Sequence, residues 1–170
     1  MGRVVMLSGP IGAGKTTVAR ELVAIWEGPL AYIEGDSFWP YFAKPKEGER
    51  GENFRILMRS MTAASLPFAR SGYDVLLDFS VPTAFLPVAL VILKDTKLDF
   101  ILLRPSLAVC AERALQRKAG KIRKYDAGFY DMFAGADEYA VADDDGDARA
   151  VALKIRAGLA AGQFRAAAPA

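Results

Sequence analysis

Residues 9–16 read Gly-Pro-Ile-Gly-Ala-Gly-Lys-Thr, and they stand between a short apolar run and a stretch with helical periodicity. Glycines let a backbone turn tightly, so that successive N–H groups can point at one anion, and a following helix adds the positive end of its dipole. The segment matches the motif G-x-x-x-x-G-K-[ST] at Gly9, Gly14, Lys15 and Thr16. It therefore predicts a phosphate-binding loop for a nucleoside triphosphate, ATP with Mg²⁺.

The residues of this loop have separate expected tasks. The ammonium group of Lys15 can reach the β- and γ-phosphates and assist transfer, and the hydroxyl of Thr16 can ligate Mg²⁺. We expect the nucleotide to contact Gly9, Ile11, Gly12, Ala13, Gly14, Lys15, Thr16 and Thr17.

Composition limits the remaining function classes. The chain has 170 residues, a net charge of +2, no histidine and one cysteine. The absence of histidine excludes histidine bases and histidine metal sites, so a general base is expected to be a carboxylate. One cysteine excludes an intrachain disulfide, and the longest apolar stretch, Val81–Leu93, is broken by proline and too short to span a bilayer. We expect a cytoplasmic protein with no membrane partner.

Short apolar runs alternate with longer helical patterns, which indicates βαβ units and a parallel sheet. The predicted strands are Arg3–Ser8, Leu30–Glu34, Asp74–Phe79, Leu98–Leu103 and Tyr139–Ala142. The predicted helices are Lys15–Trp26, Asn53–Ser71, Thr83–Leu93, Ser106–Lys118, a short Gly128–Phe133 and one capped by Asp147. Lys44–Glu52 is predicted as a loop, residues 1–165 as one domain, and 166–170 as a frayed tail.

Two kinds of phosphate-loop protein are disfavoured. The guanine-reading sequence N-K-x-D is absent, which argues against a GTPase. The third strand ends in Asp78 followed by Phe79, whereas motor-type ATPases place a water-activating glutamate there. A hydrolytic engine is therefore not expected.

Four segments together resemble the small P-loop kinases of metabolites, in particular the gluconate kinase and shikimate kinase group. They are GPIGAGKTT (9–17), IEGDSF (33–38), LLDF (76–79) and RALQRKAGKIRK (113–124). Antibiotic kinases, zeta toxins and polynucleotide 5′-kinases share much of the pattern. The resemblance implies an α/β three-layer sandwich, with a five-stranded parallel sheet in the order 2-3-1-4-5 and a small lid at about 113–135.

Three carboxylates lie at or just after the ends of strands whose carboxyl ends should face the ligand crevice. Phosphoryl transfer to an alcohol needs a carboxylate that orients the hydroxyl and takes its proton. The resemblance puts Asp36 in that role and Glu34 near Mg²⁺, while Asp78 is expected to contact substrate or metal-bound water. The alternative is structural: Asp36 and Ser37 would form a turn or helix cap, and Asp78 would cap the next helix.

Arginines provide the other candidate groups. Arg113 and Arg117 share a helical face, and the resemblance suggests that Arg113 stacks on adenine while Arg117 touches the transferring phosphate. Gly120 would be the hinge of a lid that excludes water. The alternative is a solvated basic helix face.

The acceptor pocket has the weakest signals. Its candidates are Phe38, Trp39, Arg55 and Arg59. The resembled kinases use an arginine from this region to hold an acceptor carboxylate or phosphate, which points to a small anionic acceptor. The alternative is an ordinary aromatic core with surface arginines.

The leading interpretation is an ATP-dependent kinase of a small hydroxylated metabolite, with a sugar acid as one candidate. A kinase acting on a nucleic-acid end or a nucleotide sugar, of zeta-toxin-like type, is the second. The net charge of +2 disfavours nucleic acid without excluding it. A nucleotide-binding regulatory ATPase is the third, and a monomer or homodimer is expected.

Overall fold

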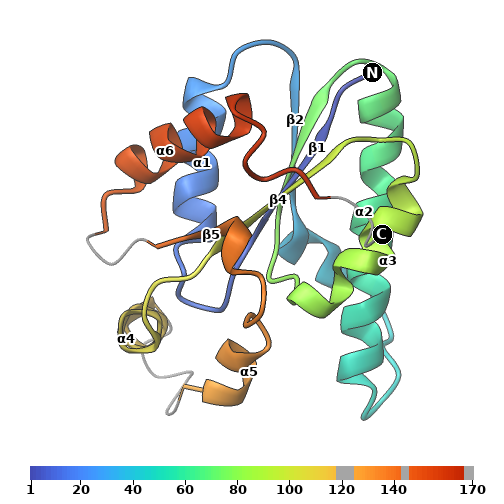
Figure 1. Ribbon diagram of the computed structural model, residues 1–170. Coiled ribbons are helices and arrows are strands. Elements are labelled where there is room, and N and C mark those ends of the chain that lie inside the picture. Colours follow the sequence, from blue (N-terminus) through green and yellow to red (C-terminus); the bar gives the residue numbers. More distant parts are fainter. Residues whose placement is uncertain (118–124, 143–145, 167–170) are drawn as a thin grey trace.

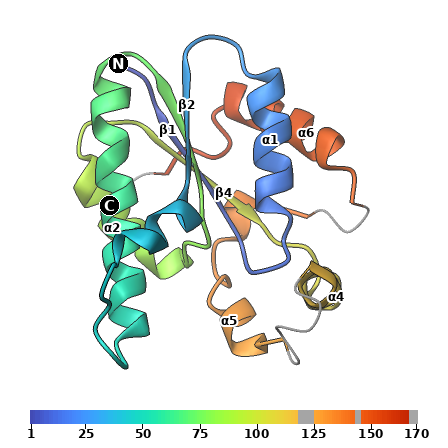
Figure 2. The ribbon, with the colours of Figure 1, turned by 180° about the vertical axis from the view of Figure 1, so that it is seen from behind.

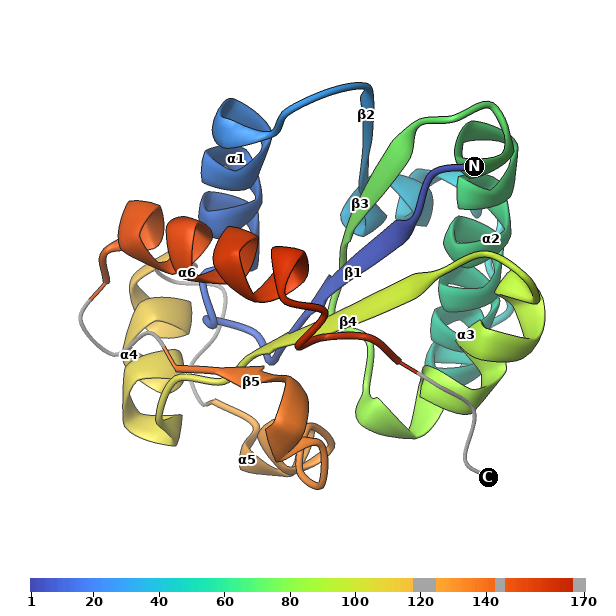
Figure 3. The same cartoon turned by 45° about the horizontal axis from the view of Figure 1, so that its top comes forward.

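The computed structural model describes residues 1–117, 125–142 and 146–166, without the side chain of Arg117. Its centre is one parallel sheet in the order β2-β3-β1-β4-β5 (Figure 3). The strands are β1 Val4–Ser8, β2 Leu30–Glu34, β3 Asp74–Asp78, β4 Leu98–Leu103 and β5 Ala140–Val141. The predicted fold class and strand order are therefore confirmed.

Helices cover both faces of the sheet. They are α1 Lys15–Ile25, α2 Arg50–Arg70, α3 Leu86–Leu93, α4 Leu107–Arg117, α5 Ala127–Asp131 and α6 Ala148–Ala160, with short 3₁₀ helices at Gly35–Tyr41, Thr83–Phe85 and Asp137–Tyr139. Helices α1 and α6 lie on one face, and α2 and α3 on the other (Figures 1 and 2). Helices α4 and α5 lie near the carboxyl ends of the strands (Figure 1). This is the predicted three-layer sandwich.

Strand β1 packs against the helices on both faces of the sheet and so joins the layers. All five of its residues are fully buried, because side chains of alternate residues enter opposite cores. Val5 and Leu7 pack on the side of α1 and α6, whereas Val4 and Met6 pack on the side of α2 and α3. The apolar run before the phosphate loop is thus buried on both faces, and it anchors the loop that follows it.

Helix α2 begins earlier than the sequence suggests. It starts at Arg50, inside the predicted loop, and it continues through Pro67 to Arg70. Leu57, Met58 and Met61 form its buried face. Because that face extends back by one turn beyond Asn53, the first turn of α2 reaches the functional site described below.

Residues 164–166 pair with the outer edge of β4 beyond the end of β5. The Phe100 N–H donates to the Phe164 carbonyl at 2.9 Å, and the Ala166 N–H donates to the Leu98 carbonyl at 2.9 Å. The predicted frayed tail is therefore wrong for Ala166, which is buried; 167–170 lie outside the described residues. The predicted cap of α6 is confirmed, because the Asp147 carboxylate accepts from the Ala150 N–H at 2.9 Å.

Across the described residues, no helix combines the length and the apolar character needed to cross a membrane.

Candidate functional site

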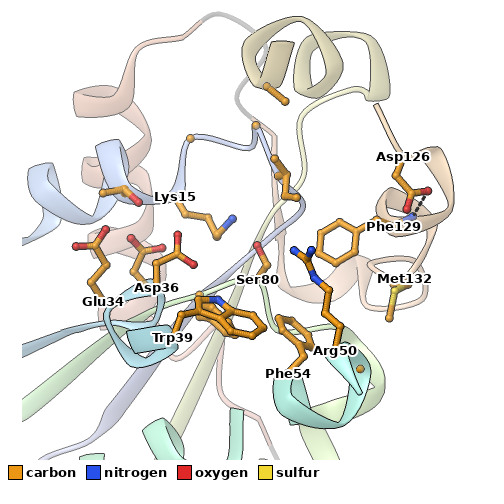
Figure 4. Close-up of a pocket in the computed structure, with 18 residues that line it drawn as sticks. Lys15, Glu34, Asp36, Trp39, Arg50, Phe54, Ser80, Asp126, Phe129 and Met132 are labelled. Atoms are coloured by element: carbon orange, nitrogen blue, oxygen red, sulfur yellow. Dashed lines mark hydrogen bonds between the residues drawn. The ribbon is translucent and has the colours of Figure 1, made fainter. Parts of the chain in front are cut away.

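A cavity of about 780 Å³ opens where the first three strands end, within the size range of small-molecule sites (Figure 4). The phosphate loop, the segments after β2 and β3, the start of α2, and helices α4 and α5 all contribute to it. Its polar lining side chains are Lys15, Thr16, Glu34, Asp36, Arg50, Asp78, Ser80 and Asp126. Carboxyl ends of parallel strands are the usual ligand-binding edge, as the sequence predicts.

The phosphate loop is held in a conformation that requires glycine. Gly12 has φ 84°, and a Cβ on it would lie 2.1 Å from the backbone oxygen of Cys110 in α4. The Lys15 ammonium donates to the carbonyls of Gly9 at 3.0 Å and Pro10 at 3.1 Å. The lysine is thereby held across the mouth of its own loop, where an anion bound by the loop would meet it.

Not every predicted loop contact faces this cavity. Ile11, Gly12, Gly14, Lys15 and Thr16 line it. Ala13 is buried in the core beneath the loop, and Thr17 is exposed on α1. Gly9 is the first residue of the loop, and its carbonyl accepts the hydrogen bond from Lys15.

The two predicted metal-site carboxylates are neighbours in the sheet. Glu34 and Asp78 end adjacent strands and are paired in register, so their side chains leave the same face. The buried Asp78 accepts a hydrogen bond from the Tyr32 hydroxyl at 3.2 Å and another from Thr16. Burial raises the pKa of Asp78, while Lys15 and the two hydroxyls act in the opposite direction. Burial, with Asp78 and Glu34 nearby, raises the pKa of Tyr32.

Asp36 approaches the cavity from a different element. It lies in the first turn of the 3₁₀ helix Gly35–Tyr41, directly after β2. Figure 4 shows its carboxylate beside Glu34 and on the side of the cavity where Lys15 lies. Asp36 is exposed, so a hydroxyl entering the cavity can reach it without displacing protein contacts.

Aromatic side chains form a wall of the cavity. Trp39 and Phe54 are stacked with ring centroids 6.3 Å apart, and Phe54 contacts Phe79 at 5.2 Å. Phe129 and Met132, from α5 and the turn after it, also line the space. Apolar faces of this extent favour a ligand with an apolar, planar part.

Four further predicted site residues do not line this cavity. Phe38 packs edge-on against Tyr41 at 5.4 Å, and Arg55 pairs with Glu52 at 2.8 Å on the exposed side of α2. Arg59 is exposed on the same helix, and the Arg113 guanidinium lies beside Gly146. Arg55 and Arg59 do share a helical face, but that face points to solvent. Among the lining residues that sequence reasoning missed are Arg50, Phe54, Ser80, Asp126, Phe129 and Met132.

The predicted lid is only partly described. Ala114 of α4 and Asp126, which caps α5 by accepting from the Phe129 N–H at 3.2 Å, both line the cavity. The Tyr125 hydroxyl donates to the Ile11 carbonyl at 2.8 Å, so the chain entering α5 is tied to the phosphate loop. The Arg117 side chain and the hinge Gly120 lie outside the described residues, and their roles stay predictions.

Magnesium binding at this edge of the sheet depends on its oxygen-bearing side chains. Among residues 1–117, 125–142 and 146–166, no group of three or more acidic, cysteine or histidine side chains could hold a metal ion by itself. The oxygens of Thr16, Asp78 and Glu34 nevertheless fit Mg²⁺, which is commonly bound through one or two carboxylates plus water and substrate phosphates.

Comparison with solved structures supports the fold. The tunicamycin resistance protein of Deinococcus radiodurans is 21% identical, with a TM-score of 0.72 over 99% of this chain and 100% of that one. The APS kinase of Mycobacterium tuberculosis, solved with AMPPNP and APS, is 18% identical, with a TM-score of 0.69 over 94% and 98%. A gluconokinase from Sinorhizobium meliloti 1021 is 21% identical, with a TM-score of 0.61 over 94% and 92%.

Those neighbours confirm the predicted kinase-type P-loop fold. No curated protein matches the chain. A family model described as chloramphenicol phosphotransferase-like protein matches residues 2–143, which include the phosphate loop, Asp36, Asp78 and helices α2, α4 and α5 that border the cavity. The chain therefore belongs to the chloramphenicol phosphotransferase-like family.

Proposed function

We propose that this protein transfers the γ-phosphoryl group of Mg-ATP to a hydroxyl group of a small molecule. The observation that carries the proposal is the meeting, in one cavity, of a phosphate loop with an exposed carboxylate from a different strand end. Lys15 and Asp36 both line that cavity. A loop that only bound nucleotide would not need a carboxylate aimed at the space where an acceptor enters.

The phosphate side of the cavity neutralises the charge of the β- and γ-phosphates and orients them. The loop N–H groups and Lys15 bind the β- and γ-phosphates. Thr16, Asp78 and Glu34 would hold Mg²⁺, which offsets negative charge on the transferring group. Because Asp78 is buried and receives two hydroxyl hydrogen bonds, its carboxylate is held in one orientation.

The acceptor side activates the hydroxyl. Asp36 accepts the hydroxyl hydrogen bond, directs the oxygen toward the γ-phosphorus and takes the proton. A bond forms between the acceptor oxygen and the γ-phosphorus, the bond from that phosphorus to the bridging oxygen breaks, and ADP leaves. Asp36 later returns its proton to water.

The wall formed by Trp39, Phe54 and Phe79 supports an acceptor with an apolar, planar part more than a fully polar sugar acid. The family description names chloramphenicol, a hydroxylated aromatic compound, which fits the same features. A sugar acid, the acceptor suggested by the sequence, remains the second candidate.

The direct test measures ADP release across a panel of chloramphenicol, sugars, sugar acids, aminoglycosides, nucleosides and oligonucleotides. We expect ADP to appear with a small hydroxylated acceptor. Asp36→Asn should lower that transfer at least about 100-fold while ATP still binds, because it removes a general base. Asp95→Asn, an exposed change away from the cavity, should leave the rate unchanged.

Three results would contradict the proposal. Full activity in Asp36→Asn would show that Asp36 is not the general base. Transfer of labelled phosphate from ATP only to the 5′ ends of oligonucleotides would indicate a polynucleotide kinase. ADP production that no acceptor stimulates would indicate a regulatory ATPase.

A further inference from the structure

A second cavity, of about 540 Å³, lies beside the main one at the start of helix α2. Trp39 and Arg50 line both spaces, so the two cavities meet at these residues. Phe42 and Asn53 extend the lining beyond that junction. Figure 4 shows Trp39 between Asp36 and Arg50 in that view. A ligand that reaches Asp36 and is longer than the main cavity would therefore continue past Trp39 into the second cavity.

The side-chain amide of Asn53 is buried without a protein partner. The residue is 6% exposed and lies on the inward face of α2, one turn before Leu57. Its amide makes no hydrogen bond with any residue that the structure describes. In that part of the chain, the polar side-chain atoms sealed from solvent without a partner are Thr96 Oγ1 and Arg104 Nε. The Asn53 amide is not among them, so it still reaches open space, and the space that Asn53 lines is the second cavity.

This buried amide selects for the chemistry of the group that meets it. Burial without a partner is costly, because the amide gives up hydrogen bonds to water. Relief of that cost requires a group that accepts from Asn53 Nδ2 and donates to its Oδ1. A carboxamide does both, because its carbonyl and N–H lie side by side in one plane. A carboxylate only accepts, so it would leave Oδ1 facing negative charge. Asn53 therefore favours a neutral group over an anion.

The cations around the second cavity do not reverse that preference. Lys46 and Arg50 line it as well, but both are exposed to solvent. Exposed charges are hydrated and screened by salt, so each contributes little to the binding of an anion. Asn53 is buried, where an unpaired hydrogen-bonding group costs most. Discrimination at this end of the site is therefore expected from Asn53.

We propose that Asn53 recognises a neutral carboxamide of the acceptor, and that this contact sets the acceptor specificity of the site. The inference rests on the proposed function. The acceptor would present its hydroxyl to Asp36 and lay its planar part along Trp39 and Phe54. Its amide would lie against Asn53 in the second cavity. Because Asn53 directly precedes Phe54, one turn of α2 supplies both the aromatic wall and the amide.

Three compounds that share a 4-(2-hydroxyethyl)phenyl group test this assignment. The other end of the ring carries a carboxamide, a methyl ketone or a carboxylate: 4-(2-hydroxyethyl)benzamide, 4-(2-hydroxyethyl)acetophenone and 4-(2-hydroxyethyl)benzoate. Calorimetry would measure the binding of each to the full chain in the presence of Mg²⁺ and AMPPNP. The ketone has the shape of the amide but no N–H, so Asn53 Oδ1 stays unpaired and we expect about tenfold weaker binding. The acid should also bind more weakly than the amide.

Asn53→Leu replaces the amide by an apolar group of similar size. It should reduce the preference for the amide over the ketone to less than about twofold, with ketone binding within about threefold of the natural protein, because no hydrogen bond to Asn53 is then made. Since the amide has no protein partner to lose, the unliganded variant should melt no lower than the natural protein. Ser60→Leu, an exposed polar-to-leucine change on the same helix, should keep the preference.

The contrary outcomes are distinct. Equal binding of amide and ketone by the natural protein, tighter binding of the acid, or no binding of any of the three overturns the assignment without any variant. A preference that persists in Asn53→Leu also overturns it. So does a lower melting temperature in that variant, because the amide would then hold the fold. Binding is measured without turnover, so an intact amide preference with no ADP release in any assay defeats the proposed function alone.

Discussion

The hydroxyl of Tyr32 donates to the carboxylate of Asp78 at 3.2 Å, although Tyr32 lies on the edge strand β2 and Asp78 ends the covered strand β3. Tyr32 and Glu34 alternate with Ile33, so both point to the side of the sheet from which Asp78 and Thr16 approach. The hydrogen bond therefore fixes one oxygen of the carboxylate that we assign to Mg²⁺.

Tyr32→Phe keeps the ring and removes only this hydrogen bond. We expect Mn²⁺, used in place of Mg²⁺ with ADP present, to bind roughly two- to tenfold more weakly, as one hydrogen bond contributes about 0.5–1.5 kcal/mol. Electron paramagnetic resonance titration measures this directly. Tyr73→Phe, a partly exposed tyrosine outside the cavity, is the matched control, and an equal effect in both variants would refute the role of Tyr32.

Asp78 also makes stability depend on pH. Burial raises its pKa above the ordinary value of 3.8, so the native protein holds this proton more tightly than the unfolded chain. Stability from this group therefore falls as pH rises from 3.8 through the raised pKa. Asp78→Asn removes the ionisable group and should raise the melting temperature at pH 7, with a gain that disappears below 3.8. A scan of melting temperature against pH checks this. A gain in melting temperature that grows in acid would contradict a raised pKa of Asp78.

The phosphate loop should tolerate no side chain at Gly12. An added Cβ would meet the Cys110 carbonyl at 2.1 Å and would also force a non-glycine residue to φ 84°. Gly12→Ala should destabilise the protein by roughly 1–3 kcal/mol or more and abolish nucleotide binding. Gly48→Ala is the control, because Gly48 has φ 74° with open space around it and bears the backbone cost alone. Denaturant unfolding and ADP titration would compare the two variants.

The buried carboxylate of Asp99 depends on Arg165. Arg165 Nε lies 2.8 Å from it, and Arg3 approaches to 3.5 Å. Arg165→Ala should cost about 2 kcal/mol, because Asp99 is fully buried and would keep only the longer partner. The double variant Asp99→Asn/Arg165→Ala should recover part of that loss. A double variant less stable than Arg165→Ala would show that the unpaired charge of Asp99 does not cause the loss of stability.

The fold could be predicted because each buried strand is a short apolar run next to a recognisable helix or turn. The run before Gly9 is buried on both faces, and its loop motif specifies the neighbouring helix. Strand ends then place Glu34 and Asp78 at one edge of the sheet. The sequence could therefore predict the location of residues that lie in the loop or at strand ends, because their place depends on the backbone alone.

The acceptor side was less accessible, because it depends on which face of α2 turns inward. Lys44–Glu52 is polar enough to resemble a loop throughout, and so Arg50 was separated from the helix that carries it. Extending the buried positions Met61, Met58 and Leu57 back by whole turns leads to Phe54 and Arg50. Phe129 and Met132 had no such signal, since tertiary packing alone brings α5 to the cavity.

The contact between Gly12 and Cys110 provides a reporter within the natural sequence. Cys110 is the only cysteine of the chain and is fully buried, and its backbone carbonyl lies against the phosphate loop. Because the thiol is buried, a reagent can modify it only after the packing around α4 opens, so the labelling rate measures how often that opening occurs. Saturation with nucleotide should slow the labelling, which makes occupancy of the loop measurable by mass spectrometry without an added probe.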